Sequence, residues 1–201
     1  MDTLQNLALA GGLSWASGFR LYATVLLAGL LGRLGYVHLP EGLQLLTDNW
    51  VLGIAGVMAV GEFLADKIPA FDSVWDAIHT LVRVPAGTLL AWGVFRDAGP
   101  GTQFAAALLG GSLAFGTHLA KTGGRALINT SPEPFSNWGA SAGEDISWLG
   151  GMYLMWRHPE VFLVLLLLFV LFLLWLVPKI VRGLRTLARR LRGQGAASSG
   201  T

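Results

Sequence analysis

The chain has 201 residues, of which 53% are hydrophobic and only 13% charged, with a formal net charge of +2. Soluble domains average about 25% charged residues, so this composition and the mean hydropathy of +0.57 indicate a membrane protein. The lack of cysteine excludes disulfides and thiolate metal sites. Nucleic acid is not an expected partner, because the basic C-terminal residues directly follow an apolar segment and are better explained as a topology anchor.

The first apolar stretch, residues 4–33, is longer than a bilayer requires. Small residues cluster just before Arg20 and leave two interpretations open. Either the helix breaks there, giving a half-helix or re-entrant element before a span over 19–34, or one long tilted helix runs through. Residues 36–49 then predict an external loop with a short interfacial helix. Further spanning helices are predicted over residues 50–64, 73–95, 103–128, 138–156 and 161–177.

We therefore expect an all-α membrane protein with about six transmembrane helices in a single domain, residues 1–184. Six spans place both termini on one side of the cell membrane, and the basic residues after 178 make that side cytoplasmic. Residues 185–201 predict a basic and then disordered cytoplasmic tail.

The two halves of the chain also resemble each other in sequence. The sequence GG followed by GFRL at 18–21 has a counterpart in GG followed by GTHL at 116–119, which suggests repeats over 4–97 and 102–180. Two copies of three helices must be inverted, because three is odd. Such inverted repeats with broken helices are typical of secondary transporters, whereas chance similarity between glycine-rich helices remains the alternative.

The stretch 61–83 is the most unusual part of the chain, because it carries many ionisable residues between apolar segments. Each costs roughly 2.5–3.5 kcal/mol in a membrane, so a sequence that keeps them uses them for binding, transport or chemistry. The candidate binding residues in this first set are Glu62, Asp66, Lys67, Asp72, Asp76, His79 and Arg83. Asp76, His79 and Arg83 fall on one face of a helix.

A second set of polar residues comes mostly from the other half of the chain. His118, Lys121 and Arg125 share one helix face by their spacing. The candidates in this set are Arg20, His118, Lys121, Arg125, Asn129, Glu133, Asn137, Glu144 and Asp145.

Glu62 and Asp66 lie one helical turn apart, so their carboxylates suit a hard divalent cation or a proton. The cationic side chains suit a phosphate or carboxylate, as in an anionic lipid headgroup. The alternative is mutual neutralisation, in which the carboxylates pair with Lys67, Arg83, Lys121 and Arg125 and only fix helix register. No residue is assigned a catalytic role.

Two blocks, GEFLADKIPAFDSVWDAIHTLVRVPAG and KTGGRALINTSPEPFSN with a following Glu-Asp pair, carry a family resemblance. They resemble the bacterial integral-membrane family catalogued as domain of unknown function 4126. The resemblance covers nearly the whole chain up to the basic tail and implies a small polytopic membrane protein, without a catalytic residue to carry over.

The function we expect is that of a small transporter or lipid-headgroup translocator with a charged site where the two repeats meet. Its partners would be the bilayer and a small ion or anionic lipid headgroup, and the sequence leaves homo-oligomer formation open. One alternative is a Mg²⁺-dependent membrane enzyme acting on a phosphorylated lipid through Asp66, Asp72 and Asp76. The other is a non-catalytic scaffold held by internal ion pairs.

Overall fold

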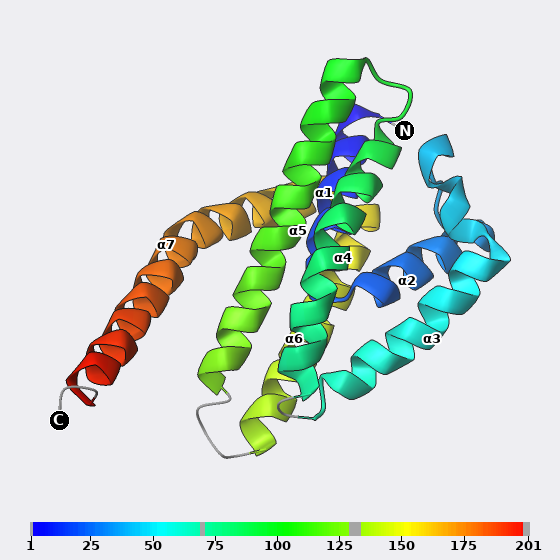
Figure 1. Cartoon of the computed structure of the whole chain (residues 1–201). Coiled ribbons are helices and arrows are strands. Elements are labelled where there is room, and N and C mark those ends of the chain that lie inside the picture. The colour runs from blue at the N-terminus through cyan, green and yellow to red at the C-terminus, as the bar shows by residue number, and fades with distance from the viewer. Residues whose placement is uncertain (1, 69–70, 129–133, 199–201) are drawn as a thin grey trace.

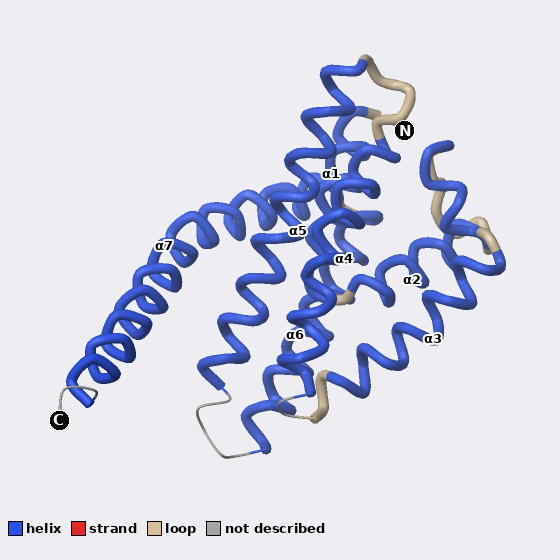
Figure 2. Tube along the Cα trace, viewed as in Figure 1, coloured by secondary structure: helices blue, strands red, loops and turns tan. Residues whose placement is uncertain are grey.

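The protein is all-helical throughout the part that the structure describes, as predicted. The structure is a computed structural model that describes residues 2–68, 71–128 and 134–198, and their side chains except at 72–73, 126–128, 134–137, 180–181 and 183–198. Its elements are α1 (Thr3–Phe19), α2 (Leu21–Arg33), the 3₁₀ helix η1 (Glu41–Thr47), α3 (Asn49–Ala65), α4 (Phe71–Val94), α5 (Pro100–Ile128), α6 (Pro134–Arg157) and α7 (Pro159–Ser198). Figure 1 and Figure 2 show α4, α5 and α6 running side by side, with α2 and α3 as an arm on one side and α7 on the other.

The helix starts follow from local chemistry. Asp48 caps α3 by accepting hydrogen bonds from the backbone N–H of Trp50 and Val51. Helices α5, α6 and α7 each begin with proline, which has the right φ for the first helical position and lacks an N–H that would go unpaired there.

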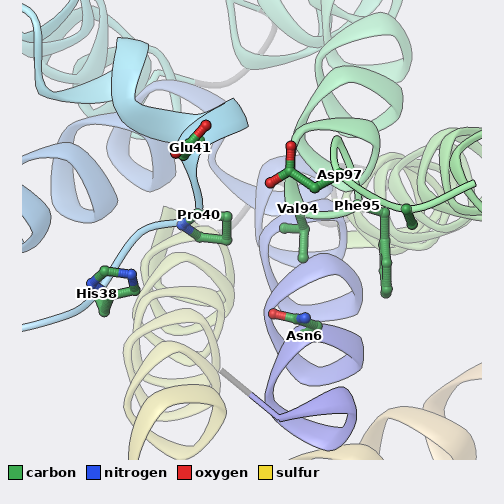
Figure 3. A pocket seen from close by; sticks show the side chains of 8 residues that line it. Asn6, His38, Pro40, Glu41, Val94, Phe95 and Asp97 are labelled. Atoms are coloured by element: carbon green, nitrogen blue, oxygen red, sulfur yellow. The ribbon is translucent and has the colours of Figure 1, made fainter.

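The first apolar stretch breaks at Arg20, which has φ −142° and ψ 87°. The break predicted before residue 21 is therefore confirmed, and the stretch is no single long helix; the helix after the break, Leu21–Arg33, has 13 residues, so the span predicted over 19–34 is not confirmed. Asn6 in α1 and His38 and Glu41 beyond α2 line one polar pocket together with Asp97, as Figure 3 shows. Because the start of α1 and the segment after α2 lie at the same end of the molecule, the chain turns back at Arg20; we call α1 and α2 the re-entrant pair for this shape, and Arg20 its tip.

This re-entrant pair changes the predicted topology. The chain enters and returns over α1 and α2, and then passes along the molecule five times, in α3 to α7. The N-terminus and the far end of α7 consequently lie at opposite ends of the molecule (Figure 1). The predicted arrangement of six spans with both termini on one side is not confirmed and stays a prediction.

Helices α1, α4 and α5 pack through small residues. Gly87 of α4 lies so close to Ala114 of α5 that a Cβ there would overlap it. The Ser14 Oγ of α1 donates a hydrogen bond to the Gly87 carbonyl oxygen at 3.0 Å. Close approach of this kind lets polar side chains of three helices reach one another across the helix axes.

The surface exposes many large apolar side chains, and the interior holds several charged residues beside its hydrophobic core. Leu81 is 81% exposed, Val57 74% and Ile146 72%, whereas Glu62 and Arg83 are fully buried. By length and composition one described helical segment, Pro159–Lys179, could cross a membrane, and η1 with α3, which meet at 65°, pass the same test as one bent pair. The predicted number of six transmembrane helices is thus not established.

Two further expectations differ from the structure or stay open. Helix α7 continues to Ser198, whereas the sequence predicts a basic and then disordered tail over residues 185–201. The leucine, alanine and arginine residues of this stretch are strong helix formers, which explains the continuation. The inverted repeat stays a prediction; the chain breaks at Arg20, but α5 runs unbroken through the matching His118.

Candidate functional site

The tip of the re-entrant pair lies in a cluster of charged side chains. Helices α3, α4, α5 and α6 each supply part of it, and Arg20 comes from the tip itself. The ion pairs join Arg20, Glu62, Asp66, Asp76, Arg83, Lys121, Arg125, Glu144 and Asp145. The sequence sets from the two halves of the chain therefore meet at one place, which we call the tip cluster.

The two broken helix ends at the tip have partners of opposite charge. The last carbonyls of α1, on Gly18 and Phe19, accept hydrogen bonds from Arg83 NH1 at 3.0 and 3.2 Å. The first N–H of α2, on Leu21, donates to Glu62 Oε1 at 3.3 Å. This arrangement matches the helix dipoles, because a helix C-terminus favours cations and an N-terminus favours carboxylates.

Arg83 links several groups of the cluster. It is fully buried, and its NH2 lies 2.7 Å from Glu62 Oε1 and 3.0 Å from Asp76 Oδ1. Its NH1 also approaches His118 Nδ1 at 3.1 Å. A guanidinium has five N–H donors and no acceptor, so it can link two carboxylates and two carbonyls at once.

Lys121 is shared between carboxylates of three helices. Its Nζ lies 3.0 Å from Asp66 Oδ1, 3.7 Å from Asp76 Oδ1 and 4.0 Å from Glu144 Oε2. It also donates to the Phe19 carbonyl at 3.4 Å. Asp66 in turn contacts Arg20 through its second oxygen at 2.8 Å. A lysine with several acceptors in reach is a point charge that can change partners by small movements.

The cluster becomes more accessible toward α6. Arg125 holds Glu144 in a two-pronged pair, with Nε–Oε1 and NH2–Oε2 distances of 2.9 Å. The Glu144 side chain is 14% exposed, and that of Asp145, which pairs with Arg20 at 2.5 Å, is 30% exposed. Glu144 and Asp145 thus form the mouth of the tip cluster, while Glu62 and Arg83 lie at its closed end.

The two histidines have different surroundings. Arg83 can only donate, so the Nδ1 atom of His118 accepts its hydrogen bond. The Nε2 atom of His118 then carries the proton and donates to Thr80 Oγ1 at 2.6 Å. Thr80 Oγ1 in turn donates to the Asp76 carbonyl oxygen at 2.8 Å. His79 instead stacks on the Trp75 ring, with 4.2 Å between the ring centroids, and its Nδ1 donates a hydrogen bond to the backbone carbonyl oxygen of Trp75. His118 belongs to the cluster, and His79 lies beside it.

Some predicted site residues are elsewhere or cannot be placed. Lys67 donates to Ser141 Oγ at 2.7 Å and lies 4.3 Å from the Phe63 ring, and it forms no ion pair with the residues that the structure describes. The side chains of Asp72 and Asn137, and residues Asn129 and Glu133 as a whole, lie outside the described residues.

Metal coordination at the tip cluster stays a prediction. No group of three or more His, Asp or Glu side chains able to hold a metal ion occurs in the described part of the chain. Glu62 and Asp66, the predicted metal ligands, are instead paired with Arg83, Lys121 and Arg20. The arrangement matches the ion-pair alternative weighed for these carboxylates, with Arg20 taking the place expected of Lys67.

Several polar groups of the site carry no clear signal in the sequence. Thr24 accepts a hydrogen bond from Trp148 Nε1 at 2.8 Å and donates to the Arg20 carbonyl at 2.6 Å, so it ties the tip to α6. The carbonyls of Gly18 and Phe19 become acceptors only because the helix breaks after them. The run of small residues before Arg20 is the one sequence signal for this break, and a prediction that the helix ends at residue 19 would have identified these carbonyls as free acceptors.

Fold and site together define an all-helical protein with an apolar surface and a cluster of ion pairs around a broken helix. The chain belongs to the family described as domain of unknown function 4126 (DUF4126), whose model matches residues 7–179. Comparison with curated proteins and with solved structures finds no match.

Proposed function

We propose that the protein is embedded in the cell membrane with α3 to α7 as its spans. The support is the exposed apolar surface, because an aqueous environment disfavours so many outward-facing leucine, valine and phenylalanine side chains. Helices α4, α5 and α6 have 24 to 29 residues, enough for a core of about 30 Å. The basic residues after Pro178 support a cytoplasmic end of α7, and the N-terminus would then lie on the other side of the membrane.

Within that membrane protein, the tip cluster is proposed to translocate a small ion or a lipid headgroup. The single observation that carries this proposal is the broken helix whose two ends are satisfied by ionisable side chains of other helices. Discontinuous helices with polar groups at the break form the binding sites of many secondary transporters. The side chain of Glu62 is fully buried and that of Asp145 is 30% exposed, so an ion or headgroup would enter the cluster from the Asp145 side.

Glu62 is the residue on which we place the coupling step. Its Oε1 accepts hydrogen bonds from Arg83 NH2 and from the backbone N–H of Leu21, while its buried Oε2 has no hydrogen-bond partner in the described structure. Uptake of a proton or cation at Oε2 would weaken the pair with Arg83, and Arg83 holds the last carbonyls of α1. Binding at Glu62 would then be transmitted to the re-entrant tip.

A scaffold without transport is the second candidate, and one observation favours it. Arg20, Arg83, Lys121 and Arg125 all have carboxylate partners, which would fix the helices in register. The described structure contains no observation that favours the Mg²⁺-dependent enzyme.

Reconstitution into liposomes separates these candidates. We expect proton flux, read by a trapped pH-sensitive dye, or translocation of a fluorescent phospholipid to be measurable for the wild type. Glu62→Gln should lower it by at least about tenfold, which corresponds to about 1.4 kcal/mol in the barrier. The control is Glu41→Gln, an exposed residue in η1.

Equal transport by the Glu62→Gln protein and the control would remove Glu62 from the mechanism. If the wild type moves neither probe above the level of empty liposomes, the scaffold is the better account.

A further inference from the structure

Two cations of the tip cluster each place a single nitrogen between two carboxylates. Arg83 NH2 lies 2.7 Å from Glu62 Oε1 and 3.0 Å from Asp76 Oδ1. Lys121 Nζ lies 3.7 Å from the same Asp76 oxygen and 3.0 Å from Asp66 Oδ1. The Asp76 oxygen is in turn shared between the two cations, so the contacts form a line and not separate pairs.

Arg20 continues this line to the mouth of the cluster. Its NH2 lies 2.8 Å from Asp66 Oδ2 and 2.5 Å from Asp145 Oδ1. Positive and negative side chains therefore alternate from the closed end of the cluster to its mouth, and we call this line the ion-pair chain. Its members are, in order, Glu62, Arg83, Asp76, Lys121, Asp66, Arg20 and Asp145.

The ion-pair chain has one negative charge in excess among the described residues. It begins and ends with a carboxylate, so it holds four carboxylates but only three cations. Glu144 leaves this balance unchanged, because Arg125 holds it in the two-pronged pair. An uncompensated charge in a buried site is strongly unfavourable. The ion-pair chain consequently favours the uptake of one positive charge.

The two ends of the ion-pair chain are the places that can receive this charge. The Glu62 side chain is fully buried, and its Oε2 has no hydrogen-bond partner in the described structure. The Asp145 side chain is 30% exposed and faces Arg20. Each inner carboxylate already lies between two cations. The charged or titratable groups that act on the buried end are Arg20, Tyr22, Asp66, Arg83 and Lys121.

The same cations can pair in two ways, depending on which end is neutralised. When Glu62 is neutral, each cation pairs with its neighbour on the Asp145 side. When Asp145 is neutral, each cation pairs with its neighbour on the Glu62 side. All of these contacts are 3.0 Å or shorter except that from Lys121 Nζ to Asp76 Oδ1, at 3.7 Å. A small shift of the Lys121 ammonium group therefore separates the two pairings.

We propose that the tip cluster takes up one positive charge, as a proton or another monovalent cation, and holds it alternately at Glu62 and at Asp145. This substrate class rests on the proposed transport function and narrows it to cations. An anionic headgroup fits poorly, because it would add a second negative charge to a chain that already has one in excess. The exchange of partners at Lys121 links the two ends.

A double-mutant cycle between the two ends tests the ion-pair chain in the full-length protein. Glu62→Gln and Asp145→Asn each remove the excess charge and leave three carboxylates for three cations. Both together leave one cation without a partner, so the double variant should be less stable than the single effects predict. We expect its melting temperature in detergent to lie at least about 2 °C below the value given by adding the two single shifts.

The matched control combines Glu62→Gln with Glu41→Gln, an exposed residue of η1 outside the ion-pair chain. The two shifts of this control pair should add, because no line of ion pairs joins the two positions. Additive shifts for Glu62→Gln and Asp145→Asn, as in the control, would overturn the proposal.

The wild type and Glu62→Gln, compared at equal ionic strength, identify the cation. For a sodium site, sodium chloride in place of choline chloride should raise the melting temperature of the wild type alone, by about 3 °C or more. For a proton site the two salts should act alike. The wild type should then lose stability relative to Glu62→Gln as the pH rises, because its folded state binds one proton more than its unfolded state. A wild type that matches Glu62→Gln in both comparisons would contradict the proposal.

These readouts are independent of transport. Non-additive ends in a wild type that shows no flux would support the cation site and contradict the transport function. Additive ends together with flux that is lost in Glu62→Gln would keep the proposed coupling residue and contradict the link through the ion-pair chain.

Discussion

Replacement of Arg83 by methionine should destabilise the protein by about 3–5 kcal/mol, the usual cost of removing one partner from a buried ion pair. Methionine keeps much of the side-chain volume but none of the N–H donors. Glu62 and Asp76 would lose their guanidinium partner, and the Gly18 and Phe19 carbonyls would lose a donor. Because these groups lie on α1, α3 and α4, the loss affects the packing of three helices.

Thermal unfolding in detergent measures this effect. For a chain of this size the expected drop in the melting temperature is roughly 6–20 °C. Arg96→Met is the matched control, because Arg96 is an exposed residue just beyond α4, and we expect a change within about 0.5 kcal/mol. Arg83→Lys should fall between the two, since lysine restores the charge but cannot reach all partners. A melting temperature of Arg83→Met equal to that of the control would show that these ion pairs do not hold the tip.

Replacement of Lys121 by methionine should have an effect of similar size, about 3–5 kcal/mol, for an electrostatic reason. The cluster then has one cation fewer among its carboxylates, and Asp66 and Asp76 both lose a neighbour within 4.0 Å. A second substitution, Asp66→Asn, removes one negative charge while keeping the shape of the side chain. The double variant should therefore be more stable than Lys121→Met alone.

A double-mutant cycle in the same unfolding assay quantifies the coupling. Direct ion pairs give coupling energies of about 0.5–3 kcal/mol, so the double variant should recover an amount in this range. Asp66→Asn alone should destabilise, because Arg20 and Lys121 both lose a partner. Strict additivity of the two single losses would mean that Lys121 and Asp66 act independently.

Helical spacing is the part of the site that the sequence predicts well. Asp76, His79 and Arg83 fall on one inward face of α4, and His118, Lys121 and Arg125 on one inward face of α5, as the spacings indicate. These are local consequences of 3.6 residues per turn. The sequence also predicts that the two sets meet in space, although the inverted repeat behind that expectation stays untested.

The sequence could not predict which acidic residue pairs with which basic residue. Which carboxylate meets which cation depends on how α1, α4 and α5 cross, and the crossing depends on small residues such as Gly87. A break before residue 21 was one of two equally compatible interpretations of the small-residue run, but the sequence predicted a span after it and not the return of α2 to the starting end. The break adds the Gly18 and Phe19 carbonyls to the site.

The central claim is that α1 and α2 form a re-entrant pair in the membrane with its tip in the charged cluster. Single cysteines test this directly, because the chain contains none of its own. We would place them at Thr3, Glu41 and Arg182, which are exposed, and label sealed vesicles with a membrane-impermeant maleimide. The re-entrant pair predicts that positions 3 and 41 react from the same side and position 182 from the opposite side. Reaction of positions 3 and 182 from one side, with position 41 on the other, would show a complete first span and contradict the account.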